Sequence, residues 1–293
     1  MAGFAVAVLS LARWTRCPGA GPSFSLGWPK RHGCRPARRF PWVWPGFLLW
    51  LGLIPAESGA GDVGTGVSWP SLVLWSWERA DDLRFIDPRN TGVAYLAKTL
   101  RLAGGSVHPL PRLQPLLVPD GTALMAVARI ETDRRHPPDL SPDQEDRCVT
   151  EILALMESRP LVGVQVDFDA KRSERPFYRR LLHKLRAGLP ESQRLSMTAL
   201  ASWVVHDRWL KDLPVDEVVP MLFRMGADGG AVRRHLASQA ALDLGAMPVS
   251  PGLSTDLDLP WLPPSTRIYL FPERSWSGQL LQTTLGRLKP WRP

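Results

Sequence analysis

From residue 67 onward the sequence alternates short apolar runs with segments of helical periodicity, and this pattern constrains the fold more than any other feature. The apolar runs predict strands over Leu72–Trp77, Val93–Thr99, Ala123–Ile130, Leu161–Phe168, Leu195–Leu200, Glu217–Phe223, Ala246–Val249 and Arg267–Phe271. Strands of this number with intervening helices predict the α/β class and a closed (β/α)8 TIM-type barrel. An open doubly wound sheet is the alternative, but no glycine-rich phosphate loop follows the first strand.

The predicted helices have recognisable ends. Ser141 is placed to cap a helix that starts at Pro142, with Gln144 as the reciprocal capping partner. Further helices are predicted over residues 173–188, 230–241 and 276–288. Two features allow for an irregular barrel: Pro220 interrupts a strand that should be central, and residues 93–118 read as a hairpin.

The basic charge is concentrated at the amino terminus. Residues 1–60 hold seven Lys/Arg and one acid, for a net charge of +6, whereas residues 61–293 carry only +2. A basic stretch, the apolar run from Phe40 to Ile54 and small residues ending at Ala60 are typical of a signal peptide. Residues 1–60 are therefore expected to be a leader, and residues 61–293 a single barrel domain. The alternative for the leader is an uncleaved inner-membrane anchor; a cleaved leader makes the protein secreted or periplasmic.

The rest of the composition excludes several function classes. A nearly balanced body has no electrostatic footprint for nucleic acid, and contact with a membrane is expected only through an uncleaved leader. Cys148 is the one cysteine after the leader and has helical spacing to apolar neighbours, so it is expected to be a buried small hydrophobe. No Cys/His spacing resembles a metal site. We expect a monomer without metal or cofactor.

The predicted fourth strand ends in the most informative segment. Alternation puts Gln165, Asp167 and Asp169 on one face, with the Cα atoms of the two aspartates about 7 Å apart. In a barrel they would lie at the carboxyl ends of the strands, where activity is found. Two competing carboxylates suit a general acid supported by a charged neighbour, as glycosidic bond cleavage requires. An Asp-x-Asp after a strand can also be simple loop capping.

Other residues at strand ends could complete a cleft. Glu78 follows the first strand, and Arg129 and Glu131 share a face at the end of the third. Trp77 and Trp203 also lie near strand ends, where flat rings could stack on sugars. The structural alternatives are salt bridges for the charged residues and core packing for the tryptophans.

The segment Val162-Gly-Val-Gln-Val-Asp-Phe-Asp169 resembles the fourth-strand signature D-G-x-D-x-D-x-E of family 18 chitinase-like glycosidases. On this resemblance Gly163 matches the glycine, Asp167 the third aspartate and Asp169 the position of the catalytic glutamate. Val162 and Gln165 replace the first two aspartates.

A second segment, Met221-Leu-Phe-Arg224, is similar to the sixth-strand M-x-Y-D of the same superfamily. Phe223 lacks the tyrosine hydroxyl, and Arg224 reverses the charge of the aspartate. In the family these two groups hold the substrate's N-acetyl group. The phrases LWSWERADDLRFID, VGVQVDFDA, SMTALASW and VVPMLFRMG also resemble an uncharacterised family of secreted bacterial barrel proteins. That resemblance covers roughly residues 70–275 and implies the barrel and the Asp-Phe-Asp site, but no substrate.

These observations give one leading hypothesis, a secreted glycosidase-like protein that acts on a polysaccharide or oligosaccharide. Asp169 would be the general acid, Asp167 its electrostatic partner and Glu78 a further carboxylate. The predicted substrate-binding residues are Gln165, Trp77, Trp203, Phe223, Arg224, Arg129 and Glu131. The rival is a non-catalytic glycan-binding protein on a degenerate glycosidase barrel. A third hypothesis is a structural envelope protein whose rim carboxylates are all tied up in salt bridges.

Overall fold

The computed structural model describes residues 69–207, 209–223, 225–238, 242, 244–256 and 265–288. The leader predicted over residues 1–60 lies outside these residues. Among the helices of the described ranges, none is both long enough and apolar enough to cross a membrane.

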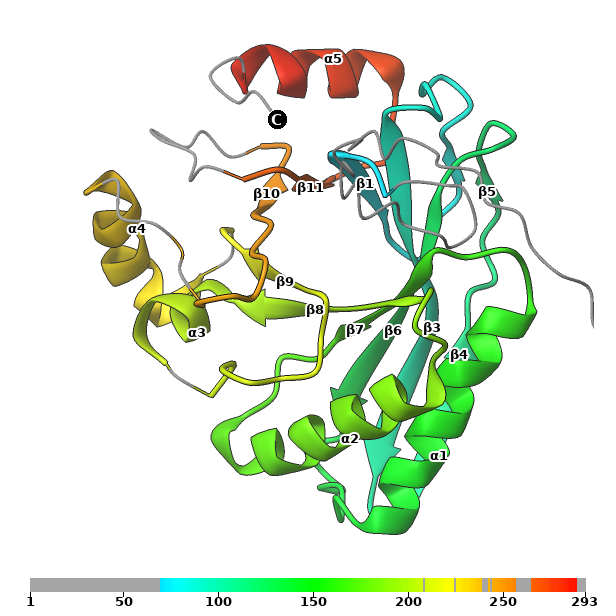
Figure 1. The fold of residues 1–293 in the computed structure, drawn as a ribbon, viewed down its shortest axis with the longest axis vertical. Helices are drawn as coiled ribbons and strands as arrows, with labels where there is room; N and C mark the ends of the chain where they lie inside the picture. Colours follow the sequence, from blue (N-terminus) through cyan, green and yellow to red (C-terminus); the bar gives the residue numbers. More distant parts are fainter. Residues whose placement is uncertain are drawn as a thin grey trace, which may run out of the picture. The chain divides into compact units, whose positions relative to one another are not determined.

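The core of the fold is a closed parallel barrel of 8 strands (Figure 1). In ring order these are β1 (Leu72–Ser76), β3 (Thr91–Ala103), β6 (Leu124–Thr132), β7 (Gly163–Asp167), β8 (Arg194–Leu200), β9 (Glu217–Met221), β10 (Gly252–Ser254) and β11 (Ile268–Phe271). The ring closes because β1 pairs in parallel with β11 on one side and with β3 on the other. The predicted TIM-type barrel is confirmed.

Alternation along the strands sorts the core into two apolar clusters. Val164 and Val166 of β7 belong to a cluster that also contains helix residues such as Cys148 and Phe177, so this cluster lies between the barrel and its helices. The second cluster contains strand residues such as Trp75 and no residue of the described helices, and it fills the barrel interior. The odd-numbered residues of β7 therefore point inward.

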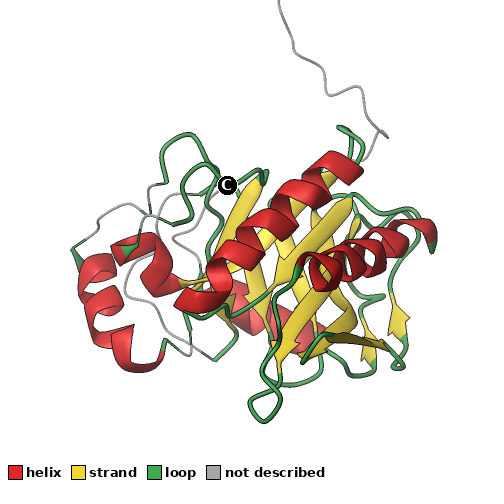
Figure 2. Ribbon diagram, turned by 90° about the horizontal axis from the view of Figure 1, so that it is seen from below, coloured by secondary structure: helices red, strands yellow, loops and turns green. Residues whose placement is uncertain are grey.

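The helices cover the outside of the barrel (Figure 2). They are α1 (Pro142–Leu153), α2 (Arg175–Gly188), α3 (Ala201–His206), α4 (Gly229–Ala237) and α5 (Gly278–Arg287), with 3-10 turns η1 (Ala154–Glu157), η2 (Arg172–Glu174) and η3 (Gly226–Asp228). The predicted start of α1 is confirmed, since the Ser141 hydroxyl accepts from the Gln144 amide at 3.3 Å. The partner of the Gln144 side chain differs slightly, because Gln144 Oε1 accepts from Leu140 N.

The barrel is irregular between β1 and β6. Residues 77–123, all described, contain no helix; besides the barrel strand β3 they form β2 (Asp81–Asp82), β4 (Ser106–Pro111) and β5 (Leu116–Leu117). β4 pairs antiparallel with the long strand β3, which confirms the predicted hairpin, and β5 pairs with β2. This excursion brings the residues around Arg112 close to the end of β1.

Three details of the prediction differ from the structure. The seventh strand was expected at Ala246–Val249, but it is the three-residue β10, and Val249 makes only an isolated bridge to Val218. Helix α3 is absent from the prediction, because its six residues are too few to show a helical period of apolar side chains. Pro220 is accommodated within β9, because Val218 N bonds Pro248 O and Leu222 N bonds Gly252 O. The amide that Pro220 lacks therefore falls on the sparsely paired β10 side.

Candidate functional site

All barrel strands run the same way, so the residues that end them meet at one opening. We call this opening the mouth; it comprises the residues at and just beyond the carboxyl ends of the barrel strands. Arg129 of β6 lies in the register opposite Asp167 of β7. Its Nη1 is 3.3 Å from Asp167 Oδ2, and its Nε donates to Glu131 Oε1 at 3.1 Å. One guanidinium thus bridges two strands and two of the carboxylates that the sequence pointed to.

Asp167 is a buried carboxylate, with 4% of the residue exposed. The Thr198 hydroxyl of β8 donates to its Oδ1 at 2.6 Å. Burial raises the pKa of Asp167, and the Asp169 and Glu131 charges raise it further, while Arg129 and the Thr198 hydrogen bond oppose the shift. The net rise means that its partners do not fully compensate for the lost hydration.

Asp169 is the exposed carboxylate of the pair. Among the residues that the structure describes, none makes a hydrogen bond or an ion pair with it. Loss of hydration raises the pKa of Asp169, and the charge of Arg129 opposes this rise. Asp169 is therefore a free carboxyl group whose pKa lies above the ordinary value, two residues beyond the end of β7.

An aromatic wall lines the mouth next to this cluster. The half-buried ring of Trp77, directly after β1, lies 5.9 Å from the Arg129 guanidinium carbon. Behind it, Trp75 is 5.3 Å away by ring centroids. Phe223 belongs to the same wall through Phe271, at 4.8 Å. This places an apolar ring and a charged cluster side by side, as sites for amphipathic ligands require.

Glu78 lies on the rim but in a different setting. Its Oε1 accepts from the main-chain amides of Leu113 and Gln114, at 2.9 and 3.2 Å. These amides belong to the β4–β5 loop, so Glu78 ties that loop to the end of β1. No contact between Glu78 and the Arg129 cluster is present among the described residues.

Two predicted contact residues are not at the surface, and the prediction for them is corrected. Gln165 is fully buried one layer below Asp167, and its Nε2 donates to Ser196 at 2.8 Å. Trp203 is 3% exposed and packs edge-on against Trp209 in the cluster outside the barrel. Neither side chain can meet a sugar from these positions. Arg224 lies outside the described residues.

Sequence reasoning missed Thr198 and Arg112. Thr198 could have been found, because alternation on β8 puts it on the inward face with Ser196, beside β7. Arg112 gave no local signal, since it lies in an irregular loop and reaches the mouth only through the fold.

Metal and thiol chemistry have no visible centre in the described ranges. No group of three or more His, Cys, Asp or Glu in these ranges could hold a metal ion. Cys148 is fully buried, and burial raises its pKa to about 12, so the thiolate is strongly disfavoured. The prediction that Cys148 is a buried small hydrophobe is confirmed.

The fold and the mouth define an irregular parallel (β/α)8 barrel that presents acidic and aromatic groups at its carboxyl end. The sequence matches no protein-family model and no curated protein. Among solved structures, it is similar to the Streptomyces coelicolor protein called chitinase A, with 10% identity and a TM-score of 0.49 over 75% of this chain and 97% of that chain.

Two further solved structures are similar. One is the chitinase domain of the spore coat protein CotE from Clostridium difficile, with 12% identity and a TM-score of 0.38 over 69% of this chain and 68% of that one. The other is the Bacillus cereus spore cortex-lytic enzyme SleL, with 19% identity and a TM-score of 0.40 over 76% of this chain. This chain spans 59% of the SleL chain.

Proposed function

We propose that the protein is a glycosidase-like enzyme that acts on a polysaccharide or oligosaccharide, with Asp169 as the general acid. The observation that carries this proposal is the free Asp169 carboxyl group, which has a raised pKa and no partner among the described residues. A general acid must hold its proton near the working pH and must be able to reach the leaving group. Loss of hydration shifts the pKa of Asp169 in the direction that the first requirement needs, and its exposure lets it reach a leaving group.

The chemistry follows from the roles of the neighbouring groups. Protonated Asp169 gives its proton to the glycosidic oxygen while the bond from that oxygen to the anomeric carbon breaks. The sugar passes through a cation-like state, water adds to the anomeric carbon, and the proton that water releases restores the acid. Asp167 is the electrostatic partner, with its orientation fixed by Thr198 and Arg129. Glu78 is the further carboxylate on the rim.

Sugar binding is assigned to the aromatic wall. Trp77 offers a half-buried ring beside Arg129, so a sugar face can stack on the ring while its hydroxyls meet the charged cluster. Phe223 extends the apolar surface, and Arg129 and Glu131 supply hydrogen-bonding groups. Arg224, which follows the end of β9 in the sequence, is proposed for the same function.

The test is sugar release by the purified full chain on a panel of bacterial and plant polysaccharides. Asp169→Asn should lower the rate by about 100- to 10,000-fold, the usual contribution of a general acid. Asp120→Asn is the matched control, because Asp120 is an exposed aspartate in the loop before β6. Wild-type activity should fall as the pH rises through the raised pKa of Asp169. An accepted substrate that is cleaved equally fast by Asp169→Asn would remove the assignment.

A second candidate, a non-catalytic glycan-binding protein, is favoured by a separate observation. Asp167 and Glu131 are both engaged by Arg129, and Phe223 has no hydroxyl where the chitinase-like pattern has tyrosine. On this alternative Asp169 accepts hydrogen bonds from sugar hydroxyls and no bond is cleaved. Calorimetric binding of an oligosaccharide with no product after prolonged incubation would favour it.

We further propose that residues 1–60 export the protein, so that it meets its glycan outside the cytoplasm. The basic stretch, the apolar run and the small residues before Ala60 support this proposal. Mass spectrometry of the mature amino terminus in the periplasmic and secreted fractions tests it. A terminus just after Ala56 or Ala60 is expected, and an intact leader in the membrane fraction would favour the anchor.

A further inference from the structure

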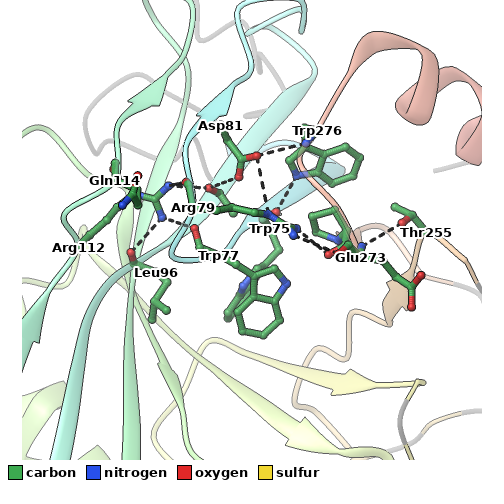
Figure 3. A network of polar contacts seen from close by, with 12 residues as sticks. Trp75, Trp77, Arg79, Asp81, Leu96, Arg112, Gln114, Thr255, Glu273 and Trp276 are labelled. Carbon is green, nitrogen blue, oxygen red and sulfur yellow. Dashed lines mark hydrogen bonds and ion pairs between the residues drawn. The ribbon is translucent and has the colours of Figure 1, made fainter.

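Among the described arginines near the mouth, Arg112 in the loop between β4 and β5 makes the most hydrogen bonds (Figure 3). It is half-buried, and each of its five N–H donors has an acceptor. The acceptors are the main-chain oxygens of Trp77, Arg79, Leu96 and Gln114 and the hydroxyl of Ser76. Three of these five acceptors belong to residues 76–79, at the end of β1. This segment includes Trp77 of the aromatic wall.

None of the five acceptors is a carboxylate, which is unusual for a half-buried guanidinium. Burial lowers the pKa of Arg112, while the more distant charges of Glu78 and Asp81 oppose the shift. A charge kept out of water without a direct counter-ion costs stability. The buried Arg112 charge fixes local geometry instead, because its planar guanidinium binds several carbonyl groups at once, which a lysine ammonium cannot do.

The contact is reciprocal. While Arg112 holds the carbonyl of Trp77, the next residue, Glu78, accepts from the amides of Leu113 and Gln114. Residues 77–78 and 112–114 are thus bound to each other in both directions. The Trp77 ring, over which the Arg129 guanidinium carbon lies at 5.9 Å, projects from this doubly bonded backbone.

The other side of the same turn is tied to the loop after β11. Arg79 donates to the carbonyls of Pro272 and Glu273, at 2.8 and 3.1 Å. Asp81 accepts from the Trp276 amide, at 3.2 Å. The segment that follows β1, residues 77–81, is therefore held between two neighbouring loops. Arg112 provides the attachment on the β3 side (Figure 3).

We propose that Arg112 is a positioning residue, which holds Trp77 and Glu78 at the mouth in the orientation that a glycan meets. It does not touch the substrate; it acts through the backbone of residues 76–79. This inference rests on the proposed function. It gives the helix-free segment between β1 and β6 a role in positioning the residues that bind the glycan.

Arg112→Lys tests the proposal, because it keeps the charge but cannot reproduce the five-bond geometry. Arg84→Lys is the matched control, since Arg84 is exposed and its side chain bonds only Asp82 within the described ranges. Hydrogen exchange of the full chain, followed by mass spectrometry, should be faster by about tenfold in peptides that contain residues 77–81 and 112–116 of Arg112→Lys, and unchanged in the control.

The second readout separates positioning from a purely structural role. On an oligosaccharide that the wild type accepts, Arg112→Lys should raise KM by about threefold to tenfold, while the pH profile of kcat, which Asp169 sets, stays unchanged. If Arg112 acts through Trp77, the double variant Arg112→Lys/Trp77→Ala should have the KM of Trp77→Ala alone. Should Arg112→Lys fail to fold, Glu78→Ala loosens the same pairing from its exposed side and must speed exchange at residues 112–116.

The outcomes divide clearly. Unchanged exchange at residues 77–81 overturns the proposal, and so does faster exchange with unchanged KM or additive KM effects. If the wild type neither cleaves nor binds any glycan of the panel, the proposed function fails. The exchange measurement then still decides whether Arg112 orders the Trp77–Glu78 segment.

Discussion

Two acidic residues inside the barrel, one at each end, have almost the same exposure and very different partners. Glu217 starts β9 at the amino-terminal end and is 4% exposed. It accepts from Arg267 at 2.6 Å, from Tyr269 at 2.6 Å and from Ser250 at 2.5 Å. Asp167, also 4% exposed at the carboxyl-terminal end, has one short hydrogen bond, from Thr198, and a 3.3 Å contact with Arg129.

This contrast separates the roles of the two ends of the barrel. At the amino-terminal end Arg267 also bonds the carbonyls of Trp69 and Pro70, so the charges are paired and the chain entering β1 is fixed. At the mouth, Arg129 is shared among carboxylates, the pKa of Asp167 is raised, and Asp169 has no partner within the described ranges. Paired charges stabilise the amino-terminal end, while the incompletely paired charges at the mouth are typical of sites that bind ligands or move protons.

The largest expected effect on stability is at the amino-terminal end of the barrel. Glu217→Gln removes the charge that faces Arg267 and should lower the free energy of unfolding by about 3–5 kcal/mol, as for other broken buried ion pairs. Urea unfolding of the full chain measures it, with the exposed Glu157→Gln as the matched control. A loss no larger than that of the control would mean that the paired charges at the amino-terminal end add no stability.

The corresponding neutralisation at the mouth is Asp167→Asn. The contribution of Asp167 to folding stability should depend on pH in the opposite direction to that of a carboxylate in a stabilising ion pair. The folded-state pKa of Asp167 lies above its ordinary 3.8, so this carboxyl favours folding below about pH 4 and loses that contribution as the pH rises through the raised pKa. Asp167→Asn should therefore gain stability relative to the wild type as the pH rises from about 4 through the raised pKa of the folded state, by about 1.4 kcal/mol for each tenfold difference in the acid dissociation constant between the folded and unfolded states. Thermal unfolding across this range measures the gain. A stability difference that does not depend on pH would contradict the prediction.

The smallest expected effect distinguishes the half-buried ring of Trp77 at the mouth from the buried ring of Trp203 outside the barrel. Trp77→Ala should weaken glycan binding by about 0.5–1.5 kcal/mol, or roughly twofold to tenfold, because one stacking surface is lost. Trp203→Phe, a change at the ring buried outside the barrel, should leave binding unaltered. Titration calorimetry with an accepted oligosaccharide compares them, and equal losses in both variants would mean that Trp77 does not contact the sugar.

Most of the barrel could be predicted because its signal is local. A buried parallel strand needs a short apolar run, and the alternation within Gly163–Asp167 already tells which residues point inward. The failures were equally local: β10 has only three residues, and the apolar run at Ala246–Val249 was a stronger signal than the strand itself. Short elements depend on neighbouring strands for their hydrogen bonds, so their own residues say little.

The site could be predicted only in part. Asp167 and Asp169 followed from one strand, and their neighbour Arg129 from another, since strand ends meet in a barrel. Burial was harder to predict: Gln165 shares a face with Asp167 but lies one layer deeper, and Trp203 turns to the helix side. The position of a residue in a strand gives its face, but not its depth below the surface.

The order of the strands, the inward face of β7 and the pair of aspartates at its end could all be derived from the amino-acid sequence, because each depends on residues close together in the chain. Which of those aspartates is paired depends on the closed barrel, since Arg129 and Thr198 come from other strands and reach Asp167 only when the ring forms. The support that Arg112 gives to the end of β1, from a loop more than thirty residues away, also exists only in the folded chain. Burial, pKa values and loop geometry are set by neighbours in space, and the closed ring of strands is what brings these neighbours together.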